Sequence, residues 1–426
     1  MNAAGTQGRL LEDLMPKIAE QWLHKVLDAM YQRRTVTRAQ IVQATKLNPA
    51  SVSHALQFLL ERGTILKVGE LQSKAGRRRD VLTLNAEAGY FVVADLEGAH
   101  ICFAITNFVG DIRYRWEEDI QLGRTLEVSE ICDGIQMVLR GLTEAQRSRL
   151  LAIGISCPGI WHKGGGVTAF NLGWHKMPLA SKLEASFDLP VYLEHSTRCA
   201  IMAERWLGLG QNVRNFAFVT VGHGVGVGIF SNGRFVGGRD KMAGELGHIR
   251  IDPTATDLCR CGKTGCLEAI VSSPNIVRQY LELSGLENQP ILGLRVGDIF
   301  DRYKHGDPFA AQVITRASKH LGLALSYLVN FLNPELIILG DDLVGGEDIF
   351  LPKIRSEIEA NSLPDFVENL EIRVSRLGHD IGLKGAASFA FRNSLNNAAV
   401  LRKMCRPAVE SLDAIEAQSA VSPQST

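Results

Sequence analysis

One short stretch, His248-Ile-Arg-Ile-Asp-Pro-Thr-Ala-Thr-Asp-Leu-Cys-Arg-Cys-Gly-Lys-Thr-Gly-Cys266, places one imidazole and three thiols close together in the chain. The thiols belong to Cys259, Cys261 and Cys266. Thiolates and a neutral imidazole are ligands that Zn²⁺ prefers, and two glycines let the chain bend tightly around one ion. Because four protein ligands leave no position for an activated water, the stretch predicts a closed, structural zinc site.

Ordinary core cysteines or a disulfide pair are the alternative for the same residues. The five other cysteines are scattered singly, which is typical of a chain kept in a reducing cytosol. The N-terminus carries acidic residues where a signal peptide needs a basic start and an apolar run. Apolar stretches such as 321–340 are interrupted by polar side chains. We therefore expect a cytoplasmic protein with no membrane segment.

The 426 residues are enough for about three domains, and their charge is unevenly distributed. Residues 1–90 hold 13 Lys and Arg against 8 Asp and Glu, whereas the remainder holds 33 against 38. This distribution predicts a small basic unit attached to a larger acidic one.

Three helices are predicted in the basic unit. The first, over 18–31, has apolar residues at helical spacing. Thr37 opens a capping box with Gln40 at the start of the second helix. Asn48 caps a third helix that runs to Arg62. A helix, a tight turn and a helix of these lengths predict a helix-turn-helix.

Two strands, over 64–68 and 81–84, follow the third helix and are joined by a basic loop. Such a hairpin can lie along the phosphate backbone as a wing while the third helix enters the major groove. The residues expected to contact DNA are Ser51, Ser53, His54, Gln57, Arg77, Arg78 and Arg79. The pattern predicts a winged helix-turn-helix, with a dimerisation or docking module as the alternative.

From about residue 89 to 393 strands and helices alternate, which predicts an α/β fold. Two segments, 90–115 and 215–237, share one pattern of three strands joined by two turns. Two lobes built on one plan leave a cleft between them. The predicted boundaries are 1–86 for the DNA-binding unit, 87–395 for the two-lobed body and 396–426 for a disordered tail.

Several motifs of the body resemble those of the ROK family, which joins bacterial repressors, open-reading-frame proteins and sugar kinases. The most specific is Ala243-Gly-Glu-Leu-Gly-His248 followed by Cys259-Arg-Cys-Gly-Lys-Thr-Gly-Cys-Leu-Glu268. With the N-terminal unit, the chain is similar to the repressor branch, beside the xylose, glucose and N-acetylglucosamine regulators. The resemblance covers about residues 20–395. It implies a two-lobed actin-like ATPase (ribonuclease H-like) fold and a homodimer or homotetramer.

The resemblance also implies where a ligand lies. In the family's kinases the sugar lies in the interlobe cleft, and the matching residues here are Pro158, Gly159, Asn171, His195, Ser196, Glu245, His248 and Glu268. Carboxylates and amides suit this role because they bind vicinal hydroxyls in pairs. Zinc would hold His248 rigid and so support the pocket. For the two glutamates, surface solvation is the alternative.

Three departures from the kinase pattern argue against phosphoryl transfer. The family's catalytic base is the aspartate of an Asn-Asp pair, where this chain has His195-Ser196. The first phosphate loop of the family reads Asp-x-Gly-Gly-Thr-Lys, where this chain has Asp95-Leu-Glu-Gly-Ala-His100. Gly340-Asp-Asp342 replaces a glycine run that lies against the nucleotide. Carboxylates near a polyphosphate repel it.

We therefore expect a sugar-responsive, DNA-binding transcriptional regulator, acting as a repressor of carbohydrate metabolism genes and without kinase activity. It would bind an operator in double-stranded DNA and a sugar or sugar derivative. Closure of the lobes would change the placement of two DNA-binding units. Two alternatives remain: a ROK sugar kinase with a DNA-binding appendage, and a regulator that answers to a protein partner in place of a sugar.

Overall fold

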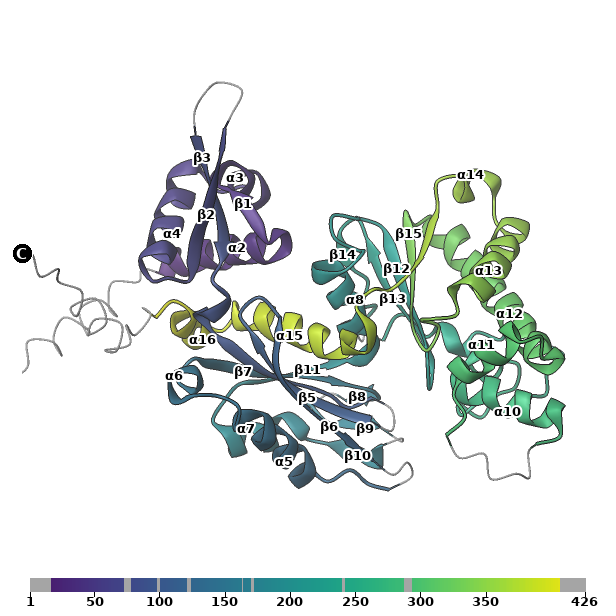
Figure 1. The fold of residues 1–426 in the computed structure, drawn as a ribbon. Coiled ribbons are helices and arrows are strands. Elements are labelled where there is room, and N and C mark those ends of the chain that lie inside the picture. The colour runs from purple at the N-terminus through teal and green to yellow at the C-terminus, as the bar shows by residue number, and fades with distance from the viewer. Residues whose placement is uncertain are drawn as a thin grey trace, which may run out of the picture.

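The structure, a computed structural model, describes residues 17–72, 78–97, 100–120, 124–162, 164–169, 172–239, 242–286 and 293–406. Within these residues the chain forms a small N-terminal unit and two lobes that lie side by side (Figure 1). The N-terminal unit covers residues 17–84. Lobe I is built around residues 90–195 and lobe II around residues 215–374. No helix in these ranges is long and apolar enough to span a membrane.

The N-terminal unit consists of α2 (Lys17–Arg33), β1 (Thr35–Thr37), α3 (Arg38–Thr45), α4 (Pro49–Glu61), β2 (Ile65–Gln72) and β3 (Arg78–Leu84). The predicted caps are confirmed. Thr37 and Gln40 form a capping box at the start of α3. The Asn48 side chain accepts a hydrogen bond from the Ser51 amide at 2.7 Å at the start of α4. Each cap contributes about 1 kcal/mol and fixes where its helix begins.

The two strands after α4 are longer than predicted. Residues 69–72 and 78–80, which the sequence assigned to a loop, belong to β2 and β3. Opposite charges lie on the two strands, and Lys67 contacts Asp80 at 2.7 Å. Such a cross-strand ion pair favours the longer strands. A third strand, β1, pairs with the other edge of β3. Its three residues are too few to show a periodicity in the sequence.

The repeated run of three strands predicted two lobes on one plan, and the structure shows that the two lobes also share one order of five strands. The sheet of lobe I has the order β11-β7-β4-β5-β6, and that of lobe II has the order β14-β13-β12-β15-β16. In each lobe three strands form an antiparallel meander and two more add in parallel. The strands of lobe I are β4 (Tyr90–Asp95), β5 (His100–Asn107), β6 (Ile112–Asp119), β7 (Leu150–Cys157) and β11 (Val191–His195). Those of lobe II are β12 (Phe216–Val221), β13 (Val225–Ser231), β14 (Arg234–Phe235), β15 (Leu336–Asp341) and β16 (Glu371–Val374).

Helices cover the faces of both sheets, so that every residue of the interior strand β7 is buried. Lobe I adds η1 (Ala86–Ala88), α5 (Val128–Leu139), α6 (Glu144–Arg147), α7 (Leu179–Phe187) and a small sheet of β8 (Ile160–Trp161), β9 (Val167–Ala169) and β10 (Trp174–Met177). Lobe II adds η3 (Leu246–His248), α9 (Leu267–Val271), α10 (Ser273–Ser284), α11 (Val296–Lys304), α12 (Pro308–Leu332), α13 (Glu347–Asn361), α14 (Pro364–Val367) and η4 (Gly378–Asp380).

Helix α8 (Ser196–Leu207) forms a common wall between the lobes. On one side it packs against α15 (Ile381–Ser394), where a Cβ on Gly385 would lie 2.1 Å from the carbonyl oxygen of Cys199. On the other side it packs against the sheet of lobe II, where a Cβ on Gly228 would lie 2.7 Å from the Ile201 side chain. Both contacts require glycine.

The N-terminal unit shares one continuous apolar core with lobe I. Tyr31 of α2 stacks on Phe391 of α15 with ring centroids 4.1 Å apart. Its hydroxyl is 3.1 Å from the Ser388 hydroxyl, and the two are hydrogen-bonded. In Figure 1 the yellow helices α15 and α16 lie between the N-terminal unit and the sheet of lobe I. The unit is therefore packed onto lobe I and not merely linked to it.

The predicted start of the disordered tail at residue 396 is wrong. Helix α16 (Ala398–Met404) buries Val400, Leu401 and Met404 in the core that the N-terminal unit shares with lobe I. A helix of seven residues offers too few repeats for its apolar stripe to be recognised in the sequence. The remainder of the predicted tail, 407–426, lies outside the described residues.

Candidate metal centre and ligand cleft

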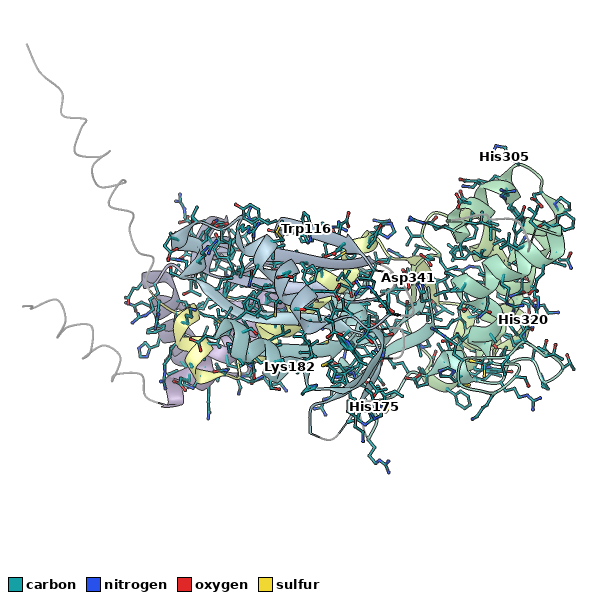
Figure 2. All side chains as sticks on the ribbon, turned by 90° about the horizontal axis from the view of Figure 1, so that it is seen from below. Trp116, His175, Lys182, His305, His320 and Asp341 are labelled. Atoms are coloured by element: carbon teal, nitrogen blue, oxygen red, sulfur yellow. The ribbon has the colours of Figure 1, made fainter. Side chains whose placement is uncertain are left out.

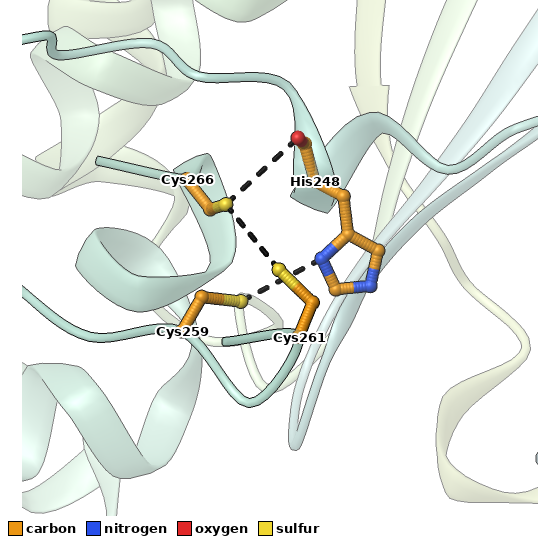
Figure 3. A group of neighbouring side chains, drawn as sticks. All are labelled: His248, Cys259, Cys261 and Cys266. Carbon is orange, nitrogen blue, oxygen red and sulfur yellow. Dashed lines mark hydrogen bonds between the residues drawn. The ribbon is translucent and has the colours of Figure 1, made fainter. Parts of the chain in front are cut away.

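The four residues predicted to bind zinc come together in lobe II (Figure 3). Nδ1 of His248 lies 3.6 Å from Sγ of Cys259, and the Sγ atoms of Cys261 and Cys266 are 3.7 Å apart. All four atoms that could bind a metal lie within 4.8 Å of one another. Around a tetrahedral zinc ion with Zn–S bonds of about 2.3 Å, neighbouring ligand atoms are about 3.5–3.8 Å apart. The eight cysteines, all within the described residues, are free thiols in the structure, which favours a metal site over the disulfide alternative.

The backbone of the loop fixes the positions of these thiols. The amide of Cys259 donates to the Lys263 carbonyl at 2.8 Å, and the amide of Gly262 donates to the Cys259 carbonyl at 2.9 Å. Gly265 has a φ of 72°, and a Cβ on it would lie 2.1 Å from the Asp252 carbonyl oxygen. Any other residue at position 265 would be strained and would clash.

Two arginines outside the predicted set tie this loop to the rest of lobe II. Arg260 donates to the carbonyl of His223 at 2.5 Å and to the Glu268 carboxylate at 3.4 Å. Arg316 of α12 donates to the Asp257 carboxylate at 2.8 Å. Arg260 stands inside the cysteine motif and Arg316 lies outside the quoted motifs, but the partners of both become visible only in the fold.

His248 connects the metal cluster with the predicted ligand site. While its Nδ1 faces Cys259, its Nε2 lies 3.9 Å from Oε2 of Glu245. The side chains of His248 and Glu245 are 38% and 57% exposed, so both are accessible to a ligand. Glu268 is instead buried, and its Oε2 accepts a hydrogen bond from the Val225 amide at 3.2 Å. A metal bound on the Nδ1 side would therefore fix the imidazole whose Nε2 faces Glu245.

The predicted ligand residues of lobe I lie at the carboxyl ends of two neighbouring parallel strands. Pro158 and Gly159 follow β7, and His195 and Ser196 stand at the junction of β11 and α8. Gly159 has a φ of 118°, a conformation that favours glycine. Asn171, also predicted to contact a sugar, lies outside the described residues.

Burial, together with the charge of Arg198, lowers the pKa of His195 to about 4, so its imidazole is neutral at neutral pH. Ser196 is buried. Arg198, which the sequence did not single out, pairs with Glu194 at 2.8 Å and lies 4.8 Å over the Phe235 ring of lobe II. This arginine therefore joins the two lobes beside the predicted ligand site.

Four carboxylates, Asp95, Glu97, Asp341 and Asp342, form what we call the acidic cluster. Asp95 ends β4 of lobe I, and Asp341 ends β15 of lobe II. Loss of hydration is the largest cause that raises the pKa of Asp95 to about 7, that of Glu97 to about 8 and that of Asp341 to about 6. Repulsion within the cluster adds to each rise. Glu97 and Asp341 are nevertheless exposed to solvent on one side.

Asp341 occupies an unusual backbone position. Its φ of 65° is in the left-handed region, which costs a residue other than glycine about 1–2 kcal/mol. Its Oδ2 accepts a hydrogen bond from the Thr220 hydroxyl at 2.9 Å. A Cβ on Gly222 would lie 2.0 Å from the same oxygen, so the carboxylate fills the space beside the glycine-rich turn after β12.

Most of the residues predicted to contact DNA lie on the surface of the N-terminal unit. Ser53 is partly exposed on α4, and His54 and Gln57 are exposed there; Arg78 and Arg79 are exposed on β3. Ser51 is an exception, because it is only 4% exposed and its side chain cannot reach a base edge. It packs on the inner side of the first turn of α4, a position that polarity alone does not reveal. Arg77 lies outside the described residues.

Arg38 was missed by the sequence-based prediction. Its guanidinium donates to the Ser53 hydroxyl at 3.0 Å and adds a positive charge beside the polar face of α4. In the sequence, its place directly after Thr37 indicates the start of α3. The contact with Ser53 of α4 cannot be recognised there.

Comparison with known proteins places these features in a family. The sequence profile described as "ROK family" matches residues 93–393. A glucokinase of Halalkalibacterium halodurans is 35% identical over 308 residues, which are 70% of this chain and 93% of that protein. The DNA-binding transcriptional dual regulator NagC of Escherichia coli K12 is 29% identical over 399 residues, which are 90% of this chain and 95% of that protein.

Solved structures give the same assignment. The crystal structure of a ROK family transcriptional regulator, described as a homologue of the Escherichia coli MLC protein, has a TM-score of 0.74 and 26% identity. The match covers 91% of this chain and 99% of that one. The matches to these two regulators extend over more of the chain than the match to the glucokinase. With its two-lobed α/β body and its cysteine-rich loop, the chain belongs to the ROK family.

Proposed function

We propose that the protein is a sugar-responsive transcriptional regulator that binds double-stranded DNA and has no kinase activity. The observation that carries this proposal is the combination of a three-helix N-terminal unit with a body whose catalytic-base position holds Ser196. The regulator relatives, which match about nine tenths of the chain, support it. Such a protein would act in the cytoplasm as a homodimer or homotetramer and repress genes of carbohydrate metabolism.

In this proposal the N-terminal unit is a winged helix-turn-helix. Val52, Ala55, Leu56 and Leu59 face the core of the unit, which leaves the polar face of α4 free for the major groove. Ser53, His54 and Gln57 are the residues that would contact base edges. Arg78 and Arg79 of the hairpin, and Arg38, would contact phosphates.

The metal in the proposed regulator is a structural Zn²⁺. The ligand set of three thiolates and one imidazole suits zinc, and it leaves no open coordination position. The ion would hold the loop closed and keep the His248 imidazole directed at the ligand. Its contribution is to binding and stability.

The effector in the proposal is a sugar or sugar derivative that lies between the lobes. Glu245 and His248 would contact it from lobe II, and Pro158, Gly159 and His195 from lobe I. A neutral imidazole can both donate and accept a hydrogen bond, which suits a hydroxyl group. Binding can change DNA affinity only if the ligand has different affinities for the open and closed arrangements of the lobes.

The test is binding of the purified full-length protein to the DNA upstream of its own coding sequence, with competitor DNA and a panel of monosaccharides. We expect specific binding that one sugar changes. The double variant His54→Ala/Gln57→Ala should bind at least about tenfold more weakly, because each lost base contact is worth about 1–3 kcal/mol. His305→Ala, on the exposed far end of lobe II (Figure 2), is the matched control and should bind as the wild type does. Equal binding by the double variant would show that α4 does not read the DNA.

The 35% identity with a glucokinase favours one alternative, an ATP-dependent sugar kinase with a DNA-binding appendage. It predicts that ATP phosphorylates a hexose in the presence of the protein and that Glu245→Ala abolishes this activity. The absence of a base at Ser196 predicts no turnover. Turnover above the background of a boiled sample would establish the kinase.

A further inference from the structure

Strand β6 is an open edge of the lobe I sheet. In the order β11-β7-β4-β5-β6 it comes last, and among the described strands it pairs only with β5. Seven of its eight residues are exposed. The edge strands of lobe II, β14 and β16, have only two and four residues, and short edge strands limit pairing with other chains. Strand β6 lacks this protection, so its backbone offers an edge to a further strand.

Two aromatic side chains lie on this edge. Trp116 is 41% exposed and Tyr114 is 38% exposed. Figure 2 shows Trp116 at the surface of lobe I. In the pair of β5 and β6, Trp116 stands opposite the fully buried Phe103, and Tyr114 stands opposite the fully buried Ile105. The apolar face of the sheet therefore continues to its edge, where no further described strand covers it.

The charges of β6 are divided between its two halves. Two arginines, at positions 113 and 115, precede Trp116, and three carboxylates, at positions 117–119, follow it. Arg115 contacts Glu117 of its own strand at 2.9 Å and Asp380 at 2.8 Å, which holds its guanidinium at the edge. The side chains of Arg115 and Glu117 are nevertheless 38% and 63% exposed. The edge therefore presents a positive half and a negative half, and both are accessible to another chain.

This order of charges makes β6 complementary to itself. When two copies of the strand lie antiparallel with the two Trp116 residues opposite each other, the basic half of each lies along the acidic half of the other. Arg115 of each copy then faces Glu117 of the other, because the arrangement has two-fold symmetry. A shift by two residues in either direction would set Arg115 against Arg115 or Glu117 against Glu117, and like charges directly opposite are destabilising. Of these three registers, only the one centred on Trp116 avoids such repulsion.

We propose that β6 is an interface between two copies of this chain, formed by antiparallel pairing of the two strands about Trp116. The pairing joins the sheets of two copies of lobe I into one, and the two Trp116 side chains cover part of each other's apolar surface. A second copy is favoured over a strand of another protein because the charges of β6 match those of β6 itself. The proposed function includes a homodimer or homotetramer without naming its contact surface, and this inference rests on that part of it.

Two charge reversals and their mixture test this pairing. In a pair of identical strands, Arg115→Glu sets carboxylates against each other, and Glu117→Arg sets guanidinium groups against each other. Sedimentation equilibrium of the full-length protein should show that each variant self-associates about tenfold more weakly than the wild type, and a tetramer with a second interface should fall to a dimer. In an equimolar mixture of the two variants, every residue at position 115 faces an opposite charge at position 117, so association should return to the wild-type level. Recovery on mixing also shows that both variants are folded.

Glu371→Arg on β16 is the matched control, because it also reverses a glutamate that pairs with an arginine two residues away on an edge strand. This variant should associate as the wild type does. Wild-type association of either β6 variant, or no recovery in the mixture, overturns the proposal. A wild-type protein that stays a monomer at every concentration overturns the homodimer or homotetramer of the proposed function as well. An oligomer that is insensitive to both reversals removes only this interface.

Discussion

The two ends of the interlobe cleft have opposite characters. At the metal end, His248 and the three cysteines are held at distances that suit one ion. Backbone hydrogen bonds close the loop, and Gly265 stands where a side chain would clash. At the acidic end, carboxyls with raised pKa values crowd together, and Asp341 has a strained backbone conformation. The metal end is held by favourable contacts, whereas the acidic end contains charge repulsion and backbone strain.

This difference shows which part of the cleft supports the fold. In the proposed regulator, loss of one zinc ligand would affect the whole loop and, through His248 and Glu268, the proposed ligand site. In the proposed regulator, a carboxylate at a phosphate-binding position would remove kinase activity and leave the sheets and helices in place.

The largest effect is expected at the metal end. Cys266→Ser removes a buried ligand, and we expect the free energy of unfolding to fall by more than about 4 kcal/mol, the range seen on loss of a structural metal. Metal content measured by mass spectrometry should fall from one zinc per chain to none. Cys132→Ser on α5, far from the loop in sequence, should leave both the zinc content and the stability close to wild type. A Cys266→Ser protein of unchanged stability would show that the two ends do not differ in this way.

At the acidic end we expect stability to fall as pH rises. The raised carboxyl pKa values mean that the folded protein holds these protons more tightly than the unfolded chain does. The stabilisation is complete near pH 4 and is lost as pH rises through the folded values of about 6–8. His195 has the opposite effect, because its lowered pKa removes stability as pH falls below about 6.5.

Between pH 6.5 and 8.5 His195 no longer changes the stability, so the pH dependence of thermal unfolding reports on the carboxyls. The midpoint should fall by about 2 °C over this range, since solvent screening reduces the effect of the exposed members. Glu97→Gln should flatten the dependence, whereas Glu359→Gln should leave its slope unchanged. A midpoint that rises with pH would contradict the picture of an acidic end under charge repulsion.

A smaller effect is expected for Asp341→Gly. Glycine relieves the left-handed strain and the repulsion, but it loses the hydrogen bond from Thr220, which is worth about 1 kcal/mol. We expect the free energy of unfolding to rise by less than about 1 kcal/mol. Asp342→Gly, at a position without a positive φ, should instead lower it slightly. Chemical denaturation of the two variants gives the comparison, and a marked loss of stability in Asp341→Gly would show that the strain is not relieved.

The smallest effect on stability is expected for Glu245→Gln. The side chain is 57% exposed and makes only a long contact with His248, so the free energy of unfolding should change by less than about 0.5 kcal/mol. If Glu245 contacts the effector, sugar binding should nevertheless weaken about tenfold. Denaturation and calorimetry on the same sample separate the two quantities. A large loss of stability would place Glu245 among the structural residues of the metal end.

The features that the sequence revealed are those with local or repeated patterns. The metal cluster follows from the spacing of three cysteines and a histidine, and the two sheets follow from a repeated strand pattern. The caps at Thr37 and Asn48 were also recognisable, because capping depends on residues three or four positions apart.

The features that it did not reveal depend on contacts between distant segments. Helix α16 is held in place by the core it shares with α2, and Ser51 is buried by its neighbours in the fold. Arg198 and Arg260 acquire their partners only when the two sheets and the metal loop are assembled. The clustering of Asp95 with Asp341 likewise requires the ends of β4 and β15 to meet across the cleft.

The shared core of the N-terminal unit and lobe I has a mechanical consequence. Tyr31 is stacked on Phe391 of α15, and α16 adds to the same core, so the N-terminal unit and lobe I are joined by continuous packing. Rotation of lobe II about α8 then leaves the N-terminal unit of the same chain in an unchanged setting. In a single chain, such a rotation would not change how the N-terminal unit contacts DNA. If the proposed regulator works by closure of its lobes, an assembly joined through lobe II would convert the rotation into a new spacing between two N-terminal units.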